Sequence, residues 1–127
     1  MILAGSDLVA FVPAVDLTAS RHFYQDTLGL PLIADQAPIA YVFDANGTML
    51  RLTAVPAVAV AGYTVLGWAV SNVAGAVDDL GERGVVFLRF DGFPQDERAI
   101  WTAPSGDRIA WFSDPATNTL SLTEFVT

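Results

Sequence analysis

The chain has 127 residues and a mass of 13.5 kDa, which predicts a single domain over residues 1–127 and excludes a multi-domain enzyme. Hydrophobic residues make up 53% of it and charged residues only 16%, so we expect an apolar core rather than disorder. The net charge of −8 disfavours nucleic acid and anionic membranes as partners, because both carry negative charge.

The absence of cysteine from the sequence excludes a disulfide, a thiolate metal ligand and a cysteine nucleophile. The first residues lack the basic segment of a secretory signal, and we expect a cytoplasmic protein. Glycine, proline or charge interrupts every apolar stretch before it reaches about 18 residues, so no membrane-spanning segment is expected.

The first half of the chain reads as a strand, a helix and three further strands. The apolar run 8–15 predicts a buried strand, and Pro13 within it favours an edge position or a bulge. Asp16 is placed to cap a helix over 17–28. Three short strands follow, at 32–34, 39–44 and 48–54. Asn46-Gly47 between the last two predicts a tight hairpin turn.

After a charge-free connector at 56–62 the same order begins again. A strand is expected at 63–70, and Asn72 is placed to cap a helix over 73–83. The residues 91–97 form a polar loop that lengthens this half. The remaining strands are expected at 85–90, 98–103, 108–113 and 118–125.

The two halves repeat each other at a nearly constant spacing. Asn72 follows Asp16 by 56 residues, and Gly84, which closes the second helix, follows Gly29 by 55. Such self-similarity predicts an internal duplication, with one module at about 1–57 and the other at about 63–127. The expected fold class is α+β, built from two tandem βαβββ modules.

Two segments of the chain resemble a known superfamily. Residues 16–30, DLTASRHFYQDTLGL, resemble the D-L-x-x-S-x-x-F-Y-x-x-x-L-G-L signature of the vicinal oxygen chelate superfamily, which includes glyoxalases, bleomycin-resistance proteins and extradiol dioxygenases. Residues 111–120, WFSDPATNTL, resemble its F-x-D-P-D-G-N-x-L ending, with Ala116-Thr117 in place of Asp-Gly. The resemblance implies a curved, cup-like mixed sheet with the helices outside, usually in a homodimer.

In the metal-dependent members of that superfamily, four cup-facing side chains supply His, Glu or Gln to a divalent cation. The corresponding positions here are Val9, Arg51, Val65 and Ser121. Valine has no donor atom, arginine is itself a cation, and one serine hydroxyl is a poor ligand. We therefore expect no metal and no other cofactor, and metal-dependent glyoxalase or dioxygenase chemistry is disfavoured. The single histidine, His22, lies on the first helix, where it is either solvated or takes part in the site.

Strand alternation, anchored at those four positions, predicts which side chains line the cup. The predicted lining is apolar with one cation and a few hydroxyls, as in many small-molecule pockets. The predicted ligand-binding residues are Val9, Phe11, Met49, Arg51, Val65, Gly67, Trp101, Trp111 and Ser121. None of these nine side chains is a usual general acid or base, so no catalytic residue is assigned.

Two alternatives stay open among these residues. Trp101 and Trp111 either stack on a planar ligand or complete the wall of the fold. Arg51 binds either an anionic group of a ligand or an internal carboxylate, with Asp35 and Asp44 as the candidates.

The sequence thus favours a metal-free, homodimeric protein that holds a small molecule in its cup, with drug sequestration as one role. The alternative is a lyase or dioxygenase of the same superfamily with a non-standard site. The sequence therefore leaves open whether the chain is an enzyme. A third hypothesis is that the fold serves only dimerisation or contact with a partner.

Overall fold

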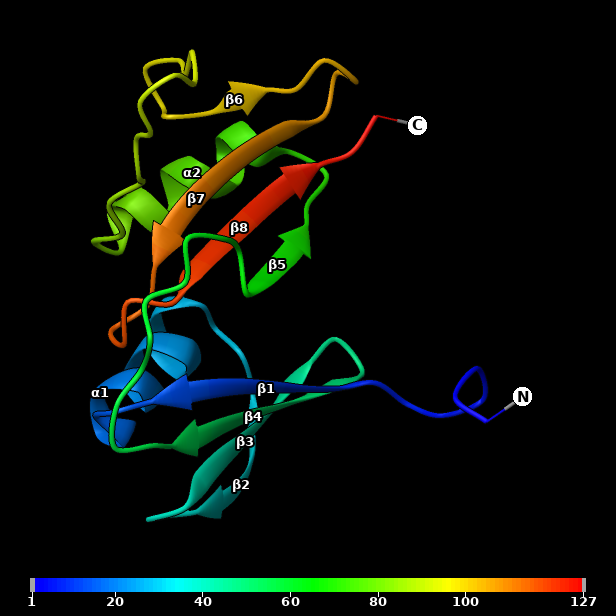
Figure 1. Ribbon diagram of the computed structural model, residues 1–127, viewed down its shortest axis with the longest axis vertical. Helices are drawn as coiled ribbons and strands as arrows, with labels where there is room; N and C mark the ends of the chain where they lie inside the picture. The colour runs from blue at the N-terminus through cyan, green and yellow to red at the C-terminus, as the bar shows by residue number, and fades with distance from the viewer. Residues whose placement is uncertain (1, 127) are drawn as a thin grey trace. The chain divides into compact units, whose positions relative to one another are not determined.

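The computed structural model describes residues 2–126. The chain divides into two compact units, Met1–Ala59 and Val60–Thr127, each with its own sheet and helix (Figure 1). Both units contain a mixed four-stranded sheet in which the first strand pairs with the fourth, so the strand order is identical. This confirms the α+β class and the two tandem modules, whereas the joining of both sheets into one cup stays a prediction. Among residues 2–126, no helix has the length and apolar character needed to cross a membrane.

The first unit follows the predicted order closely. Its elements are β1 (Val9–Ala14), α1 (Leu17–His22), the π-helical turn η1 (Phe23–Thr27), β2 (Leu32–Gln36), β3 (Ala40–Ala45) and β4 (Thr48–Ala54). Asp16 caps α1 as predicted, because its Oδ1 accepts a hydrogen bond of 3.0 Å from the backbone N–H of Ala19. Pro13 lies in β1, which is an edge strand, so its missing N–H removes no hydrogen bond from the sheet interior.

The first helix ends differently from the prediction of one regular helix over 17–28. The chain widens into the π-helical turn, where the N–H of Leu28 bonds to the carbonyl of Phe23 at 2.9 Å. Gly29 then adopts a φ of 76°, and the N–H of Leu30 reaches the carbonyl of Tyr24 at 3.0 Å. Gly29 therefore closes the helix as predicted, because a left-handed residue at this position favours glycine.

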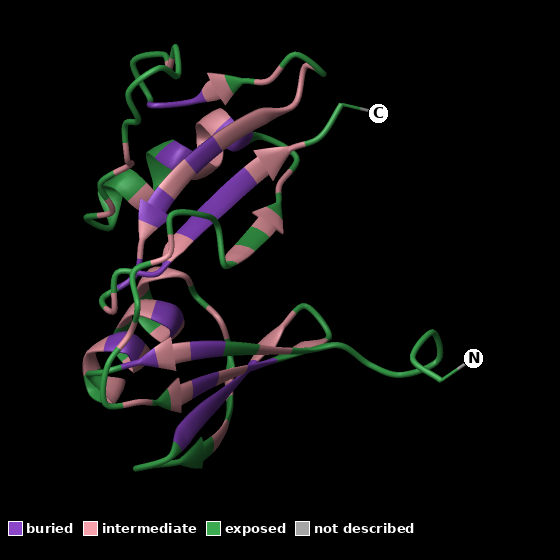
Figure 2. Cartoon of the chain, viewed as in Figure 1, coloured by how far each residue is buried: buried purple, intermediate pink, exposed green. Residues whose placement is uncertain are grey.

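The core of the first unit lies between its sheet and α1. Val12, Leu50 and Leu52 are almost fully buried on the sheet, and Tyr24 packs on Phe43 with ring centroids 6.2 Å apart. Because side chains alternate along a strand, the residues between these positions point to the opposite face. Figure 2 shows the resulting mixture of buried and exposed positions along the strands. We call this opposite side of each sheet its open face.

The second unit contains β5 (Leu66–Ala69), α2 (Val73–Glu82), β6 (Trp101–Thr102), β7 (Arg108–Ser113) and β8 (Thr119–Glu124). Asn72 caps α2 as predicted, since its Oδ1 accepts from the N–H of Gly75 at 3.1 Å. Its core repeats that of the first unit, with Phe112 and Leu120 of the sheet buried together with Val73 of α2. The β5 strand is shorter than the predicted 63–70.

Two predicted strands of this unit are wrong in extent. Residues 85–90 form no strand, only a bridge between Phe87 and Phe112, and the predicted strand 98–103 is reduced to β6. The side chain of Gln95 explains the first result, because it binds the N–H of Phe90 at 2.8 Å and the carbonyl of Leu88 at 2.9 Å. The second follows from Ala99, whose φ of 64° interrupts an extended backbone.

The turn before β8 is held by a buried carboxylate. Asp114 Oδ1 accepts from the N–H groups of Ala116 and Asn118, both at 2.9 Å, and Asp114 Oδ2 accepts from Asn118 Nδ2 at 2.8 Å. Within this turn Thr117 has a φ of 65°. A β-branched residue is unfavourable in the left-handed region of backbone conformation. The superfamily signature that this segment resembles has glycine at the position of Thr117.

Thr117→Gly is therefore expected to stabilise the protein. Relief of the left-handed strain outweighs the added freedom of glycine in the unfolded chain, so the free energy of unfolding should rise by about 1 kcal/mol. Urea denaturation measures it, and Thr102→Gly in β6 is the control that should lose stability. A loss of stability in both variants would contradict a strained Thr117.

Candidate functional site

Four of the predicted ligand-binding residues share the open face of the first sheet. Val9 is paired with Met49 and Phe11 with Arg51 across the parallel β1 and β4 strands. Their neighbours Val12 and Leu50 point toward α1, so strand alternation places the four predicted side chains on the other side. Phe11 is 67% exposed, which makes it an accessible aromatic surface beside the Arg51 position.

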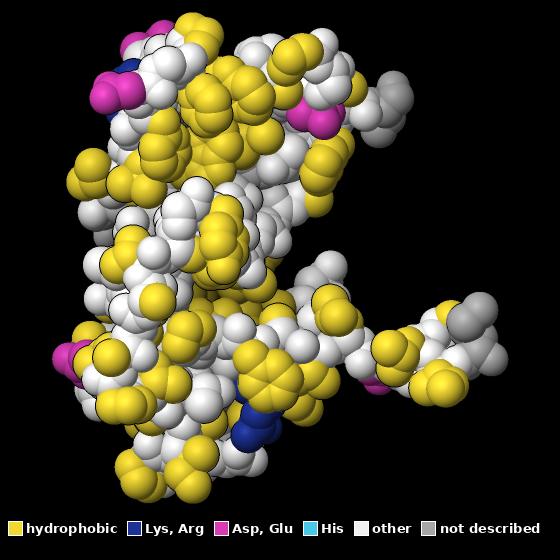
Figure 3. All heavy atoms as spheres, viewed as in Figure 1, with side chains coloured by type: hydrophobic (Ala, Val, Ile, Leu, Met, Phe, Trp, Pro, Cys, Tyr) yellow, Lys and Arg dark blue, Asp and Glu magenta, His cyan; other side chains and the backbone are white. Residues whose placement is uncertain are grey.

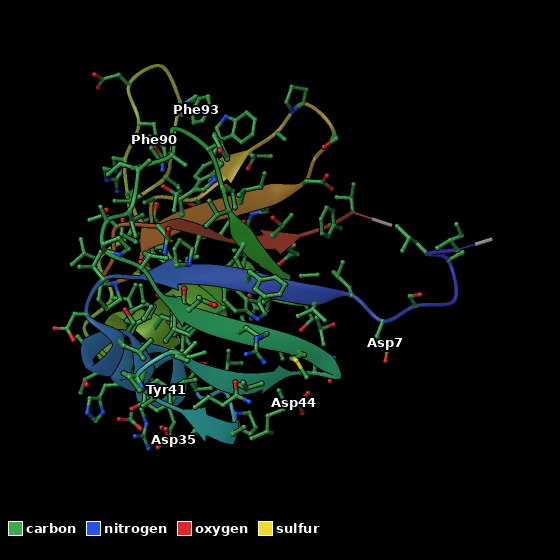
Figure 4. The ribbon with its side chains drawn as sticks, turned by 60° about the horizontal axis from the view of Figure 1, so that its bottom comes forward. Asp7, Asp35, Tyr41, Asp44, Phe90 and Phe93 are labelled. Carbon is green, nitrogen blue, oxygen red and sulfur yellow. The ribbon has the colours of Figure 1, made fainter. Side chains whose placement is uncertain are left out.

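Arg51 binds neither of the carboxylates that the sequence suggested. Its Nη2 donates to Gln36 Oε1 at 2.8 Å, and among residues 2–126 no acidic oxygen lies within ion-pair distance of it. Asp35 accepts instead from the N–H of Ala37 at 3.0 Å, and Asp44 accepts from that of Gly47 at 2.8 Å. Figure 4 shows both aspartates in the first unit.

The other predicted residues share the open face of the second sheet. Ser121 of β8 is paired with Gly67 of β5 on one side and with Trp111 of β7 on the other. The approach at Gly67 is close, because a Cβ added there would lie 2.6 Å from Ser121 Oγ. Trp101 is paired with Ile109, two residues before Trp111, so both tryptophans point to this face. Val65 extends the row, donating its N–H to the carbonyl of Thr119 at 2.9 Å.

The two tryptophans belong to a larger group of rings, which we call the aromatic cluster: Phe90, Phe93, Trp101 and Trp111. Phe93 stacks on Trp101 with ring centroids 4.8 Å apart and planes 15° apart, and on Trp111 at 5.7 Å. Phe90 meets Trp111 edge to face at 5.4 Å. Figure 4 shows Phe90 and Phe93 close together in the second unit.

Sequence reasoning missed Phe90 and Phe93 because the first was assigned to a strand and the second to a polar loop. The available signal was an aromatic residue between Gly92 and Pro94, which few solvated loops contain. Phe90 and Phe93 are still 39% and 43% exposed, so the cluster offers ring surface to a ligand.

The side chain of Gln95 holds the segment that carries these rings. Besides its bonds to Phe90 and Leu88, its Nε2 donates to the carbonyl of Ala99 at 2.8 Å. Asp96 adds a second fixed point, because its Oδ1 accepts from the N–H groups of Arg98 and Ile100, both at 2.9 Å. The loop is therefore tied through side chain to backbone bonds rather than through a strand ladder.

A hollow of about 350 Å³ lies beside the aromatic cluster. In the wall of this hollow, Trp111 Nε1 donates a hydrogen bond to Thr64 Oγ1 at 3.1 Å. Tyr63 is 71% exposed. Of the described residues that line the hollow, Tyr63 is the only one with an acidic or basic side chain. Its lining includes Tyr63, Thr64, Phe90, Phe93, Trp111 and Thr119. Figure 3 shows hydrophobic side chains gathered on this second unit.

The residues at hand do not fit a divalent metal. The four positions that correspond to metal ligands carry Val9, Arg51, Val65 and Ser121, which together offer one hydroxyl oxygen. Within residues 2–126 no three His, Cys, Asp or Glu side chains gather closely enough to hold a metal ion. His22 is exposed on α1, which packs on the side of the first sheet opposite its open face, and its Nδ1 lies 3.0 Å from Asp26 Oδ2.

A second, charged hollow of about 600 Å³ lies between α2 and residues 87–99. Arg98 crosses it to Asp78, with Nε to Oδ1 at 2.9 Å and Nη2 to Oδ2 at 3.2 Å. This hydrogen bond holds the pKa of the Asp78 carboxyl below its ordinary value and raises the pKa of Arg98. Both side chains are partly exposed, so the pair positions the loop more than it stabilises the fold.

The model of the Glyoxalase/Bleomycin resistance protein/Dioxygenase superfamily matches residues 7–122. No curated protein matches the sequence.

Several solved structures share the fold. A member of the same superfamily from Sphaerobacter thermophilus DSM 20745 is 24% identical, with a TM-score of 0.74 over 95% of this chain and 98% of its own. TnmS3, an antibiotic binding protein from Streptomyces sp. CB03234, is 23% identical, with a TM-score of 0.72 over 99% and 100%. Lactoylglutathione lyase from Agrobacterium tumefaciens is 19% identical, with a TM-score of 0.70 over 94% and 93%. At these identities the likeness establishes the fold.

Removal of the Gln95 brace should weaken the fold and loosen the loop. Gln95→Ala leaves one N–H and two carbonyls of a half-buried segment without their side-chain partner, so the free energy of unfolding should fall by about 1–3 kcal/mol. The amide of Phe90 should exchange with solvent faster. The matched control is Gln25→Ala, which removes one bond from Arg21. Equal stability of the two variants, with Phe90 protection unchanged, would show that Gln95 does not hold the loop.

Proposed function

Because the chain belongs to the glyoxalase/bleomycin resistance protein/dioxygenase superfamily, we propose that it is a metal-independent binding protein for small molecules. Its ligand is a planar aromatic or amphipathic compound that stacks against the aromatic cluster. The open face of the second sheet supplies further contacts through Val65, Gly67 and Ser121, and the open face of the first sheet offers its own ligand contacts through Val9, Phe11, Met49 and Arg51.

The observation that carries this proposal is the aromatic cluster beside its hollow. A volume of about 350 Å³ accommodates a small ligand, and the exposed rings of Phe90 and Phe93 offer faces and edges for stacking. In this proposal the two tryptophans contact the ligand, in addition to forming part of the wall of the fold. Thr64 and Thr119 add hydroxyl groups that orient a polar substituent.

The chemistry of the lining supports binding over catalysis. General acid or base catalysis usually relies on His, Asp, Glu or Lys at the ligand, and the described residues lining the hollow include none of these, with the exposed phenol of Tyr63 as their only acidic group. The four positions corresponding to metal ligands supply too few donors for a Lewis acid, so no step is assigned to a metal. A lyase or dioxygenase of the same superfamily is the alternative, and elemental analysis that finds stoichiometric zinc, nickel, manganese or iron would favour it.

The antibiotic binding protein from Streptomyces, which shares the fold, lends support to drug sequestration as the role of such a protein. We further propose that the protein is cytoplasmic and that it forms a homodimer. Exposed apolar side chains are consistent with a partner surface, since Leu8, Ile33 and Ile39 are 75%, 56% and 68% exposed.

Tryptophan fluorescence offers a direct test of the proposal. A panel of planar aromatic ligands, including anthracyclines, aromatic acids and bleomycin, should contain compounds that quench Trp101 and Trp111. Phe93→Ala removes a stacking partner, so the affinity should fall roughly 10-fold. Phe125→Ala is the matched control, because Phe125 is 60% exposed and lies outside the cluster. Trp68→Phe should leave the dissociation constant unchanged, because strand alternation turns Trp68 toward the α2 side.

Two results would contradict the proposal. One is the absence of quenching and of calorimetric heat across the whole panel. The other is an equal loss of affinity in Phe93→Ala and Phe125→Ala, because the ligand would then bind away from the aromatic cluster.

A further inference from the structure

Arg51 has no carboxylate within ion-pair distance among residues 2–126 and lies on an open sheet face. Arg98 and Arg108 approach carboxylates, and Arg89 donates to two backbone carbonyls. Arg21, on α1, donates to Gln25 Oε1 at 3.1 Å and lies over the ring of Tyr41, 4.8 Å from its centroid. Arg51 also has a neutral amide oxygen, Oε1 of Gln36, as its hydrogen-bond partner among the described residues, but it lies on the open face of the first sheet, where strand alternation places it beside Phe11.

We propose that Arg51 and Gln36 form a subsite for the carboxylate of an aromatic or amphipathic ligand. The inference rests on the proposed function, and it adds that the open face of the first sheet selects a negatively charged ligand. It resolves the alternatives left by the sequence, because Asp35 and Asp44 bind backbone N–H groups of their own turns instead of Arg51.

The sheet register explains how the guanidinium is positioned. Arg51 of β4 is paired with Val42 of β3, and Gln36 of β2 is paired with Ala40 of the same strand. The bond from Arg51 to Gln36 therefore crosses β3 on the open face, above Val42 and Ala40, which are 2% and 1% exposed. The aliphatic stem of arginine suits this apolar crossing, and the hydrogen bond fixes the orientation of the charged end.

The donors that remain match a carboxylate. A guanidinium has five N–H groups in a planar fork, and one of the two on Nη2 is directed to Gln36 Oε1. With Oε1 accepting, the Nε2 group of Gln36 presents further N–H donors beside the guanidinium. Carboxylates accept two parallel bonds from such a fork, and charge-assisted bonds of this kind are stronger than neutral ones.

The apolar surroundings say what else the ligand carries. Phe11 lies directly across from Arg51 on β1 and is 67% exposed, while Met49, two residues before Arg51, is 39% exposed. An aromatic or alkyl group attached to the carboxylate would cover both. The net charge of −8 repels free anions, so this subsite selects an anion that also brings apolar surface.

The test uses two compounds with one ring system and different charge, 2-naphthoate and 2-naphthamide, titrated by calorimetry into the full chain. The wild-type protein should bind 2-naphthoate more tightly than 2-naphthamide. Arg51→Gln should weaken 2-naphthoate roughly 10- to 100-fold, the range of a lost charge-assisted bond, and leave 2-naphthamide within about twofold. Arg51→Lys keeps the charge without the fork and should give an intermediate loss.

Arg21→Gln is the matched control, because it removes the same charge from α1 and keeps the open face intact. The Arg21→Gln variant should bind both compounds as the wild-type protein does. The Arg51→Gln variant should lose affinity for 2-naphthoate while its thermal unfolding stays unchanged. Equal weakening of 2-naphthoate by Arg21→Gln and Arg51→Gln would overturn the subsite, since the effect would then be one of net charge. If 2-naphthamide binds while 2-naphthoate gains nothing from Arg51, the subsite is wrong and the proposed function stands. Failure of both compounds, and of the wider aromatic panel, counts against the proposed function itself.

Discussion

The parallel pairing of the first and fourth strands of each module sets which side chains reach the open faces. In the first unit, β1 pairs with β4 so that Phe11 lies across from Arg51. In the second, β5 pairs with β8 so that Gly67 lies across from Ser121. If the register of either strand pair shifted by one residue, the side chains now buried against the helix would point to the open face. The side chains now on the open face would point into the core. Core residues and open-face residues alternate along the same strands. The strand register that buries the hydrophobic core therefore also determines which side chains reach the open faces.

Much of the fold could be predicted because local signals determine it. The caps Asp16 and Asn72 each bond to an N–H three residues further on, and Gly29 and Gly84 take positive φ values of 76° and 92°. The hairpin at Asn46-Gly47 likewise has positive φ at both residues. Such signals act within a few residues, so a sequence pattern reveals them.

The parts that could not be predicted depend on hydrogen bonds made by side chains, whose partners no local pattern specifies. Residues 85–90 carry an apolar pattern typical of a strand, yet Gln95 takes the backbone groups of Phe90 and Leu88. This brings Phe93 onto Trp101 and creates the aromatic cluster. The partner of Arg51 was missed for a related reason, since Gln36 lies two strands away and its fit depends on the pairing register. The residues of the open faces were predictable, whereas their partners were not.

The open face of the first sheet offers apolar contact and one guanidinium, and that of the second offers ring stacking, while no group of metal ligands occurs among residues 2–126. The account therefore depends on binding that needs no metal. The most direct measurement is a calorimetric titration of a planar aromatic carboxylate into the protein after exhaustive treatment with EDTA, repeated with added zinc, nickel, manganese or iron. The account predicts saturable binding with the same dissociation constant in every case. Binding or turnover that appears only with one of the metals would contradict it.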